Sequence, residues 1–108
     1  MKRFATHRVY NLLTGEISCF QVIELDEYGT VSKLYPFSEE IRSTEWLPGL
    51  IVLSPCPVER LQGEYFSQFK ERMVNNFPPD STCRAYWLTS FNVTDMEFTE
   101  GSHFCPLV

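Results

Sequence analysis

The segment that most constrains the fold is residues 50–53, Leu-Ile-Val-Leu, which directly follow the pair Pro48-Gly49. Four consecutive apolar residues, two of them β-branched, are typical of a strand that is covered on both faces. The Pro-Gly pair favours a turn immediately before that strand, because glycine tolerates backbone angles that other residues avoid. We therefore predict that residues 50–53 form the central strand of the fold.

Strand patterns also fill the preceding residues, so that strands are expected over about 8–53. Gly15 and Gly29 supply the turns, and the segment 38–44 is predicted to be a loop. Pro36 lacks a backbone N–H, so the strand over 30–37 is expected to lie at a sheet edge or to end there. In the strand over 17–25, alternation predicts two faces, with Gln21 interrupting the first: Ile17, Cys19, Ile23 and Leu25 on one, and Ser18, Phe20, Val22 and Glu24 on the other.

The apolar period changes after residue 56 and predicts one amphipathic helix over about 57–77. Gly63 is unfavourable inside a helix and leaves a later start open, and Pro78-Pro79 ends the pattern. Strand character returns over about 82–108, with a short strand near 96–99 and an extended tail over 104–108. We predict a single α+β domain over residues 1–108, built as a mainly antiparallel β-sheet or small sandwich with one helix packed against it.

The net charge of the chain limits the kinds of molecule that it is expected to bind. The chain of 108 residues has a net charge of −5, which disfavours binding to nucleic acid and to anionic membranes. The residue sequence has no apolar run long enough to span a bilayer and no signal-peptide pattern near its start, so we expect a cytoplasmic protein whose four cysteines are thiols. Nothing in the sequence indicates a cofactor.

The junction Pro48-Gly49-Leu50-Ile51 resembles the entry to the metal-binding barrel of the amidohydrolase superfamily. In that family, strands of a split β-sandwich, the composite domain, precede the barrel, and a His-x-His motif follows the junction. Ser54 and Cys56 stand where the two histidines would be. A (β/α)₈ barrel needs roughly 250 residues, so the resemblance implies a composite domain without the barrel, its metal or its chemistry.

Cys56 is the best-placed reactive residue, because the predicted helix begins beside it and a helix N-terminus favours a thiolate. The alternative is that Cys56 is a small packing residue between two prolines. His7 is expected to be a surface residue rather than a general base.

His103 and Cys105 have a spacing that lets both side chains face one way in an extended tail, and with Cys83 or Cys19 they could bind zinc. The alternative is a solvated histidine and a core cysteine, because no C-x-x-C pair is present. A third set of side chains is aromatic and could line a ligand pocket or an interface, although strand spacing also suits the core: Tyr86, Trp87, Phe91, Phe98 and Phe104.

The sequence favours a non-catalytic binding or protein-interaction module, which could form a homodimer through an unpaired edge strand. We do not predict an enzyme, because no nucleophile–base pair or metal motif is evident. The alternatives are a thiol-dependent enzyme or redox-sensitive protein that uses Cys56, and a zinc-stabilised domain.

Overall fold

Seven strands and one helix make up the protein in a computed structural model that describes residues 2–38, 44–73, 77–78 and 81–107. The elements follow in the order β1 (Lys2–Asn11), β2 (Glu16–Leu25), β3 (Val31–Pro36), β4 (Thr44–Trp46), β5 (Leu50–Ser54), α1 (Phe66–Met73), β6 (Arg84–Thr89) and β7 (His103–Pro106). The strands form one mixed sheet in the order β3-β2-β1-β5-β6-β7, and β4 also pairs with β1. The predicted α+β fold with a mainly antiparallel sheet is confirmed; only β4 and β5 pair with β1 in parallel.

The predicted central strand is confirmed. All five residues of β5 are buried, and β5 lies between β1 and β6. Leu50 and Val52 face a core cluster that includes helix α1, whereas Ile51 and Leu53 face a second cluster between the curved strands. Burial on both faces is the physical reason for the unbroken apolar run.

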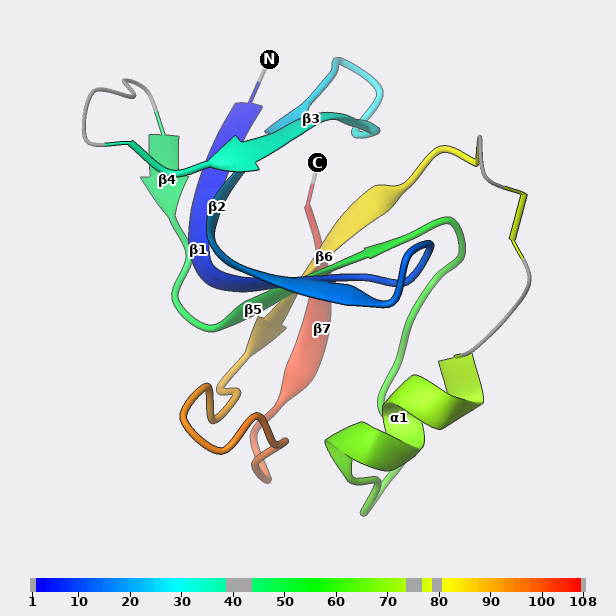
Figure 1. Ribbon diagram of the computed structural model, residues 1–108. Helices are drawn as coiled ribbons and strands as arrows, with labels where there is room; N and C mark the ends of the chain where they lie inside the picture. The colour runs from blue at the N-terminus through cyan, green and yellow to red at the C-terminus, as the bar shows by residue number, and fades with distance from the viewer. Residues whose placement is uncertain (1, 39–43, 74–76, 79–80, 108) are drawn as a thin grey trace.

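The sheet is strongly curved, and β1 and β2 bend together in their middle (Figure 1). Phe20 has φ of 49°, in the left-handed region that bulky residues rarely adopt. Phe4 and Val9 are an odd number of residues apart in β1 yet belong to the same core cluster. Simple alternation therefore fails at the bend. β1 and β2 keep one register through it, but residues of different parity point inward before and after it, so the two predicted faces of residues 17–25 are wrong as continuous faces.

The curvature brings the first residues of β3 to the start of β6. Thr30 forms an isolated antiparallel bridge with Arg84, and the Val31 N–H donates to the Cys83 carbonyl at 2.8 Å. Pro36 is the last residue of β3, which lies at one end of the strand order, as predicted.

The chain from β4 to β5 runs along one edge of β1 and is interrupted there by Pro48-Gly49. β4 pairs with residues 3–5 of β1 and β5 pairs with residues 8–11, so the two short strands share that edge. Gly49, with φ of 107°, fills the interval: its carbonyl accepts the Arg8 N–H at 3.2 Å and the Thr6 hydroxyl at 3.1 Å. Strand β4 was not predicted; Thr44 begins it, and residues 39–43 of the predicted loop lie outside the described residues.

The predicted helix over 57–77 is too long. Helix α1 covers only Phe66–Met73, and Phe77 lies outside it, while 74–76 are not described. Gly63 has φ of 74° and ends any helical path before Tyr65. The helix begins where its free N–H groups find acceptors: the Phe66 N–H donates to Glu97 at 2.5 Å, and the Tyr65 N–H donates to Gln68 at 3.0 Å.

The C-terminal strands differ from the prediction in one place. The predicted short strand near 96–99 is a turn, closed by paired backbone hydrogen bonds of 2.9 and 3.0 Å between Asn92 and Glu97. Met96 adopts a positive φ of 50°, which a continuous strand would not allow. The extended tail is confirmed as β7, which pairs with β6, although Val108 is not described. No helix among the described residues is long and apolar enough to cross a bilayer.

We predict that Gly49→Ala lowers the free energy of unfolding by about 1–3 kcal/mol, because a Cβ at φ of 107° is strained whatever space surrounds it. Gly101→Ala is the matched control, since an added Cβ there meets only Ser90 at an ordinary 3.6 Å. Urea denaturation measures both variants. Equal unfolding free energies for the two would contradict the role assigned to Gly49.

Candidate functional site

Four aromatic rings meet on the side of the sheet away from helix α1, and we call this set, His7, Phe20, Phe37 and Trp46, the aromatic surface. Trp46 is its hub: the His7 ring lies 4.8 Å away and the Phe37 ring 5.9 Å away, both edge-on. Phe20 stacks on Trp46 at 6.5 Å and contacts His7 at 5.9 Å. The rings come from β1, β2, the residue after β3, and β4, so only the folded sheet brings them together.

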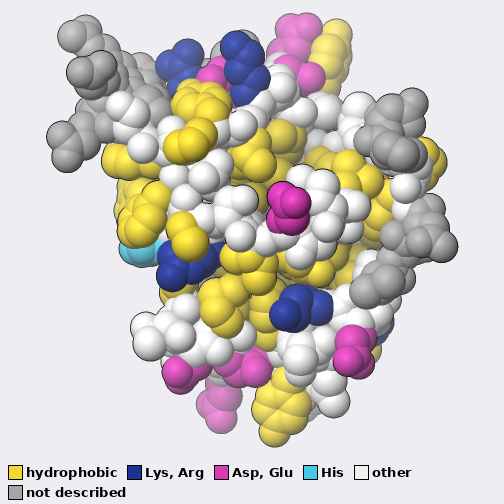
Figure 2. Space-filling view, in the orientation of Figure 1, with side chains coloured by type: hydrophobic (Ala, Val, Ile, Leu, Met, Phe, Trp, Pro, Cys, Tyr) yellow, Lys and Arg dark blue, Asp and Glu magenta, His cyan; other side chains and the backbone are white. Residues whose placement is uncertain are grey.

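Three of these side chains are unusually exposed. The exposed fractions are 51% for Phe20, 40% for Phe37 and 41% for Trp46. Figure 2 shows hydrophobic side chains gathered on the side of the molecule where β4 lies in Figure 1, next to a histidine and a basic side chain. A contiguous exposed aromatic group of this kind marks an interaction site more often than a scattered apolar residue does.

His7 connects the aromatic surface to the Gly49 interruption. The Gly49 N–H donates to His7 Nδ1 at 3.2 Å. A neutral imidazole has one donor and one acceptor nitrogen, so this hydrogen bond places the ring proton on Nε2. The aromatic surface therefore contains a fixed N–H donor among the rings.

The same face of the sheet carries a buried carboxylate that is charge-compensated. Glu24 is 5% exposed, and Arg3, its register partner on β1, lies 3.6 Å from it. A hydrogen bond from Tyr35, followed by the charge of Arg3, lowers the pKa of Glu24 despite its burial, and the same bond raises the pKa of Tyr35. The carboxylate thus joins β1, β2 and β3 through Arg3 and Tyr35.

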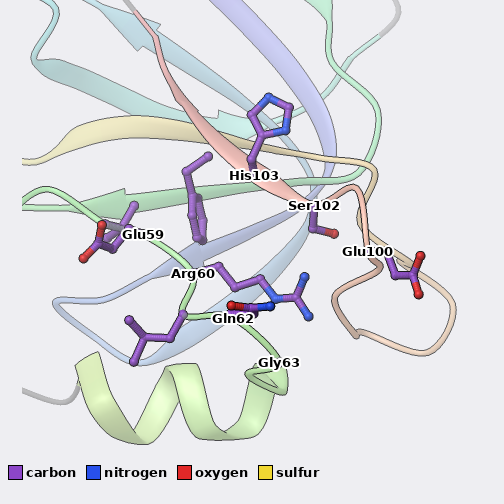
Figure 3. Close-up of a pocket in the computed structure, with 10 residues that line it drawn as sticks. Glu59, Arg60, Gln62, Gly63, Glu100, Ser102 and His103 are labelled. Atoms are coloured by element: carbon purple, nitrogen blue, oxygen red, sulfur yellow. The ribbon is translucent and has the colours of Figure 1, made fainter.

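A groove of about 750 Å³ lies on the helix side, between the segment before α1 and the start of β7 (Figure 3). It is lined by Val58, Glu59, Arg60, Leu61, Gln62, Gly63, Glu100, Ser102, His103 and Phe104. Arg60 extends across it, but its guanidinium is already occupied: it donates to the carbonyls of Thr99 at 2.7 Å and Glu64 at 3.2 Å, and it lies 4.7 Å from the Phe98 ring. Arg60 therefore links the segment before α1 to the loop that contains Thr99.

One wall of the groove is held by an ion pair between buried Glu64 and the exposed Arg72. Glu64 is 7% exposed and receives two hydrogen bonds from Arg72 of α1, at 2.8 and 3.0 Å. Arg72 also donates to the Glu59 carbonyl at 2.6 Å. Hydrogen bonding from Arg72 is the main cause that lowers the pKa of Glu64, against the opposing effect of burial.

The aromatic residues that the sequence suggested for a ligand pocket or interface instead pack in the core or fasten a turn. Tyr86, Phe91 and Phe98 are buried in the core cluster around α1. Phe104 is half-buried and stacks on Phe69 at 5.3 Å. Trp87 is half-buried and its indole N–H donates to the Pro48 carbonyl at 3.0 Å, which fastens the Pro-Gly turn to β6.

Cys56 does not lie at a helix start, because α1 begins only at Phe66. This removes the physical reason for expecting an activated thiolate. Its backbone N–H donates to the buried Ser54 hydroxyl at 3.1 Å, and that hydroxyl donates to the Cys56 carbonyl at 2.7 Å, so the two residues form a local turn. All four cysteines are free thiols; Cys19 is exposed, and burial raises the pKa of the Cys83 thiol.

The possible zinc ligands do not converge. His103 lines the groove, where its Nδ1 lies 3.0 Å from the Thr89 hydroxyl, and Cys105 stands opposite Trp87 in the β6–β7 ladder. Cys83 is in the core between the curved strands, and Cys19 is exposed on β2. In the part of the chain that the structure describes, no three His, Cys, Asp or Glu side chains gather in a manner that could hold a metal ion.

Sequence reasoning missed the aromatic surface. Its members are far apart in the chain, and strand alternation assigns each one separately. One signal was available: Gln21 interrupts the alternation beside Phe20, which is where the strand bends. A bend predicted at that point would have separated the faces of the strand before Phe20 from those after it.

Comparisons with protein-family models, with curated proteins and with solved structures found no match to this chain.

We predict that a mild alkylating agent at neutral pH modifies Cys19 first and Cys83 last. Cys19 is exposed, whereas Cys83 is buried and its pKa is raised, so little of it is thiolate. Mass spectrometry of the time course gives the order. Modification of Cys56 well ahead of Cys19 would instead revive a thiol-based activity.

We predict that Glu64→Gln lowers the free energy of unfolding at pH 7 by about 1–3 kcal/mol, because Arg72 then loses its charged partner. The native pKa of Glu64 is lower than its unfolded value, so the stability from this group is present above that value and is lost as the pH falls through the native pKa. The variant should therefore show a shallower loss of stability below about pH 4.5 in acid titrations followed by circular dichroism. An unchanged slope would contradict the assignment.

Proposed function

We propose that the protein is a non-catalytic protein-interaction module and that the aromatic surface is its binding site. The single observation that carries this proposal is the packed set of four rings, three of which are at least 40% exposed. Tryptophan and other aromatic side chains dominate the binding energy of protein interfaces because they bury large areas with few rotatable bonds. Rings that already pack on one another lose little further freedom on binding.

The chemistry of the aromatic surface supports binding over catalysis. Its titratable ring, His7, has Nδ1 engaged by the Gly49 N–H, so the ring presents a donor rather than a basic nitrogen. A general base needs a free lone pair within reach of the substrate proton. The arrangement favours recognition of an acceptor atom.

The edge strands give less support to a homodimer formed by edge-to-edge pairing. β3 and β7 lie at the two ends of the strand order. β3 is tied at Val31 to Cys83, the residue before β6, and ends at Pro36, and β7 ends at Pro106. Short strands that end in proline discourage edge-to-edge pairing.

Two features of the wider proposal stay predictions. One is a cytoplasmic location, in which the four free cysteines would remain reduced. The other is a relation to the composite domain of the amidohydrolases, which rests on the Pro48-Gly49 junction.

Site-specific photo-crosslinking in cells tests the proposal. A photoreactive amino acid at position 37, within the aromatic surface, should yield a discrete protein adduct that mass spectrometry can identify. The same amino acid at position 65 is the matched control, because Tyr65 is 62% exposed and lies just before α1. We expect Trp46→Ala to abolish the adduct formed from position 37.

Identical adducts from positions 37 and 65, or an adduct that survives Trp46→Ala, would contradict the proposal. An adduct with a second copy of the chain would assign the aromatic surface to self-association. Light scattering of the purified protein would then show a dimer that Trp46→Ala dissociates.

A further inference from the structure

We infer that the aromatic surface is switched by pH. When the His7 ring takes up a proton it releases the Gly49 N–H, the rings around Trp46 rearrange, and binding at the aromatic surface is lost. The inference rests on the proposed function and adds the regulation of the same site. Three observations carry it: the hydrogen bond between Gly49 and His7, the ring contacts of His7, and a register that keeps other titratable groups away from the ring.

The hydrogen bond from Gly49 requires a neutral His7 ring. The Gly49 N–H donates to His7 Nδ1 at 3.2 Å. Nδ1 accepts only while it carries no proton, and an imidazolium carries a proton on each of its nitrogens. Protonation therefore sets two N–H groups against each other across this contact, and the bond is lost. Imidazole is the side chain that ordinarily changes its charge between about pH 5 and pH 8.

The effect of that loss on the Pro-Gly turn is local. Among the described residues, no acceptor other than His7 receives the Gly49 N–H. The Gly49 carbonyl, in contrast, keeps its bonds from the Thr6 hydroxyl and from the Arg8 N–H, neither of which titrates in this range. The two short strands β4 and β5 therefore stay attached to β1 while the His7 ring is released, so the fold persists through the change.

The released ring cannot move without changing the aromatic surface. His7 lies edge-on against Trp46 at 4.8 Å and contacts Phe20 at 5.9 Å. Turning the protonated Nδ1 away from the Gly49 N–H changes both ring contacts at once. Phe20 also has a left-handed backbone, which persists only where surrounding contacts hold it. Loss of the His7 contact therefore disturbs the hub ring and its stacked neighbour together.

The charged and titratable side chains that flank these rings along the strands lie on the other face of the sheet. Arg8 is the register partner of Cys19 and of Leu50, and Leu50 faces the core cluster around α1. Glu45 precedes Trp46 in β4, so strand alternation turns it away from the rings. The other rings that pack with His7, from β2, β4 and the residue after β3, are indole or phenyl and do not titrate.

The charges on the same face as His7 do not change in the range in which imidazole titrates. Arg3, Glu24 and Lys33 form a row across β1, β2 and β3, further along β1 than His7. A hydrogen bond from Tyr35 lowers the pKa of Glu24, and the same bond raises the pKa of Tyr35. Arginine and lysine stay protonated. Among the described residues of this face, His7 is therefore the group that responds to mild acid.

NMR titration of the purified full chain between about pH 8 and pH 5.5 tests the release directly. We expect the Gly49 amide signal and the Trp46 indole N–H signal to shift along the same curve as the His7 ring. The Gly49 proton should move upfield, because it loses its hydrogen bond. Circular dichroism over the same range should show an unchanged fold.

Two variants separate the switch from histidine titration in general. His7→Asn places an uncharged acceptor oxygen near the position of Nδ1, so the Gly49 signal should keep its hydrogen-bonded position throughout the range. His103→Gln is the matched control, because it removes the other histidine of the chain, which lines the groove on the helix side. That variant should retain the coupled titration of Gly49, Trp46 and His7.

Photo-crosslinking from position 37, repeated in cell lysate buffered at about pH 7.5 and pH 5.5, gives the functional readout. If only the neutral form binds, the apparent affinity falls about tenfold for each pH unit below the midpoint of the His7 titration. We therefore expect the adduct formed at the higher pH to be largely lost at the lower pH. In the His7→Asn protein the ratio of adduct at the two pH values should stay close to one.

A Gly49 signal that does not follow the His7 titration would overturn the inference. An adduct whose yield does not fall with pH, or falls equally in the wild-type and His7→Asn proteins, would overturn it as well and leave the proposed function intact. The absence of any adduct at the higher pH would instead refute the proposed function and the regulation of binding with it, while the NMR titration would still decide whether His7 releases Gly49.

Discussion

The structure depends on the way the Gly49 peptide units attach to β1. The Gly49 carbonyl accepts the Thr6 hydroxyl and the Arg8 N–H, and its N–H donates to His7. These bonds let two short strands, β4 and β5, share one edge of β1 despite the break between them. From the other side, the Trp87 indole holds the Pro48 carbonyl. Side chains thus supply hydrogen-bond partners to the backbone groups of this turn, where a regular strand ladder would supply backbone partners.

That attachment also determines what the outer face of the sheet presents. β4 places Trp46 opposite Ala5, and the hydrogen bond to Gly49 orients the His7 ring against Trp46. Across β1, Phe20 adopts its left-handed conformation at the bend. A strained backbone at a bulky residue persists only where surrounding contacts hold it, and such strain is common at functional sites.

The phenylalanines near α1 and the rings around Trp46 differ in their exposure to solvent. On the helix side, phenylalanines are closed off by cationic side chains, with Arg60 lying 4.7 Å from the Phe98 ring and Arg72 lying 5.6 Å from the Phe69 ring. On the other side, the rings around Trp46 remain exposed. The same residue types therefore stabilise the core at one place and offer a binding surface at another. This division is the main reason for placing function on the aromatic surface rather than in the groove, where the guanidinium of Arg60 is occupied in fastening two loops.

Sequence patterns could predict the parts of the fold that depend on local chemistry. The run Leu50–Leu53 indicated a doubly buried strand, and Pro36 marked an edge. The helix was overextended because Val58 and Leu61 continue its apolar period. In the structure Val58 is buried, Leu61 is 48% exposed, and the turn at Gly63 with the buried Glu64 separates them from α1. The aromatic surface could not be predicted in the same way, since it arises from a parity change in bent strands and from four segments that meet only after folding.

The most direct test of this account is the tautomer of the His7 ring, measured by long-range ¹H–¹⁵N correlation NMR on the folded protein near pH 8. The account predicts the Nε2–H form, with Nδ1 shifted by its hydrogen bond from Gly49. A proton on Nδ1 would contradict it, because Gly49 could not then donate to His7 and the aromatic surface would not have its oriented donor.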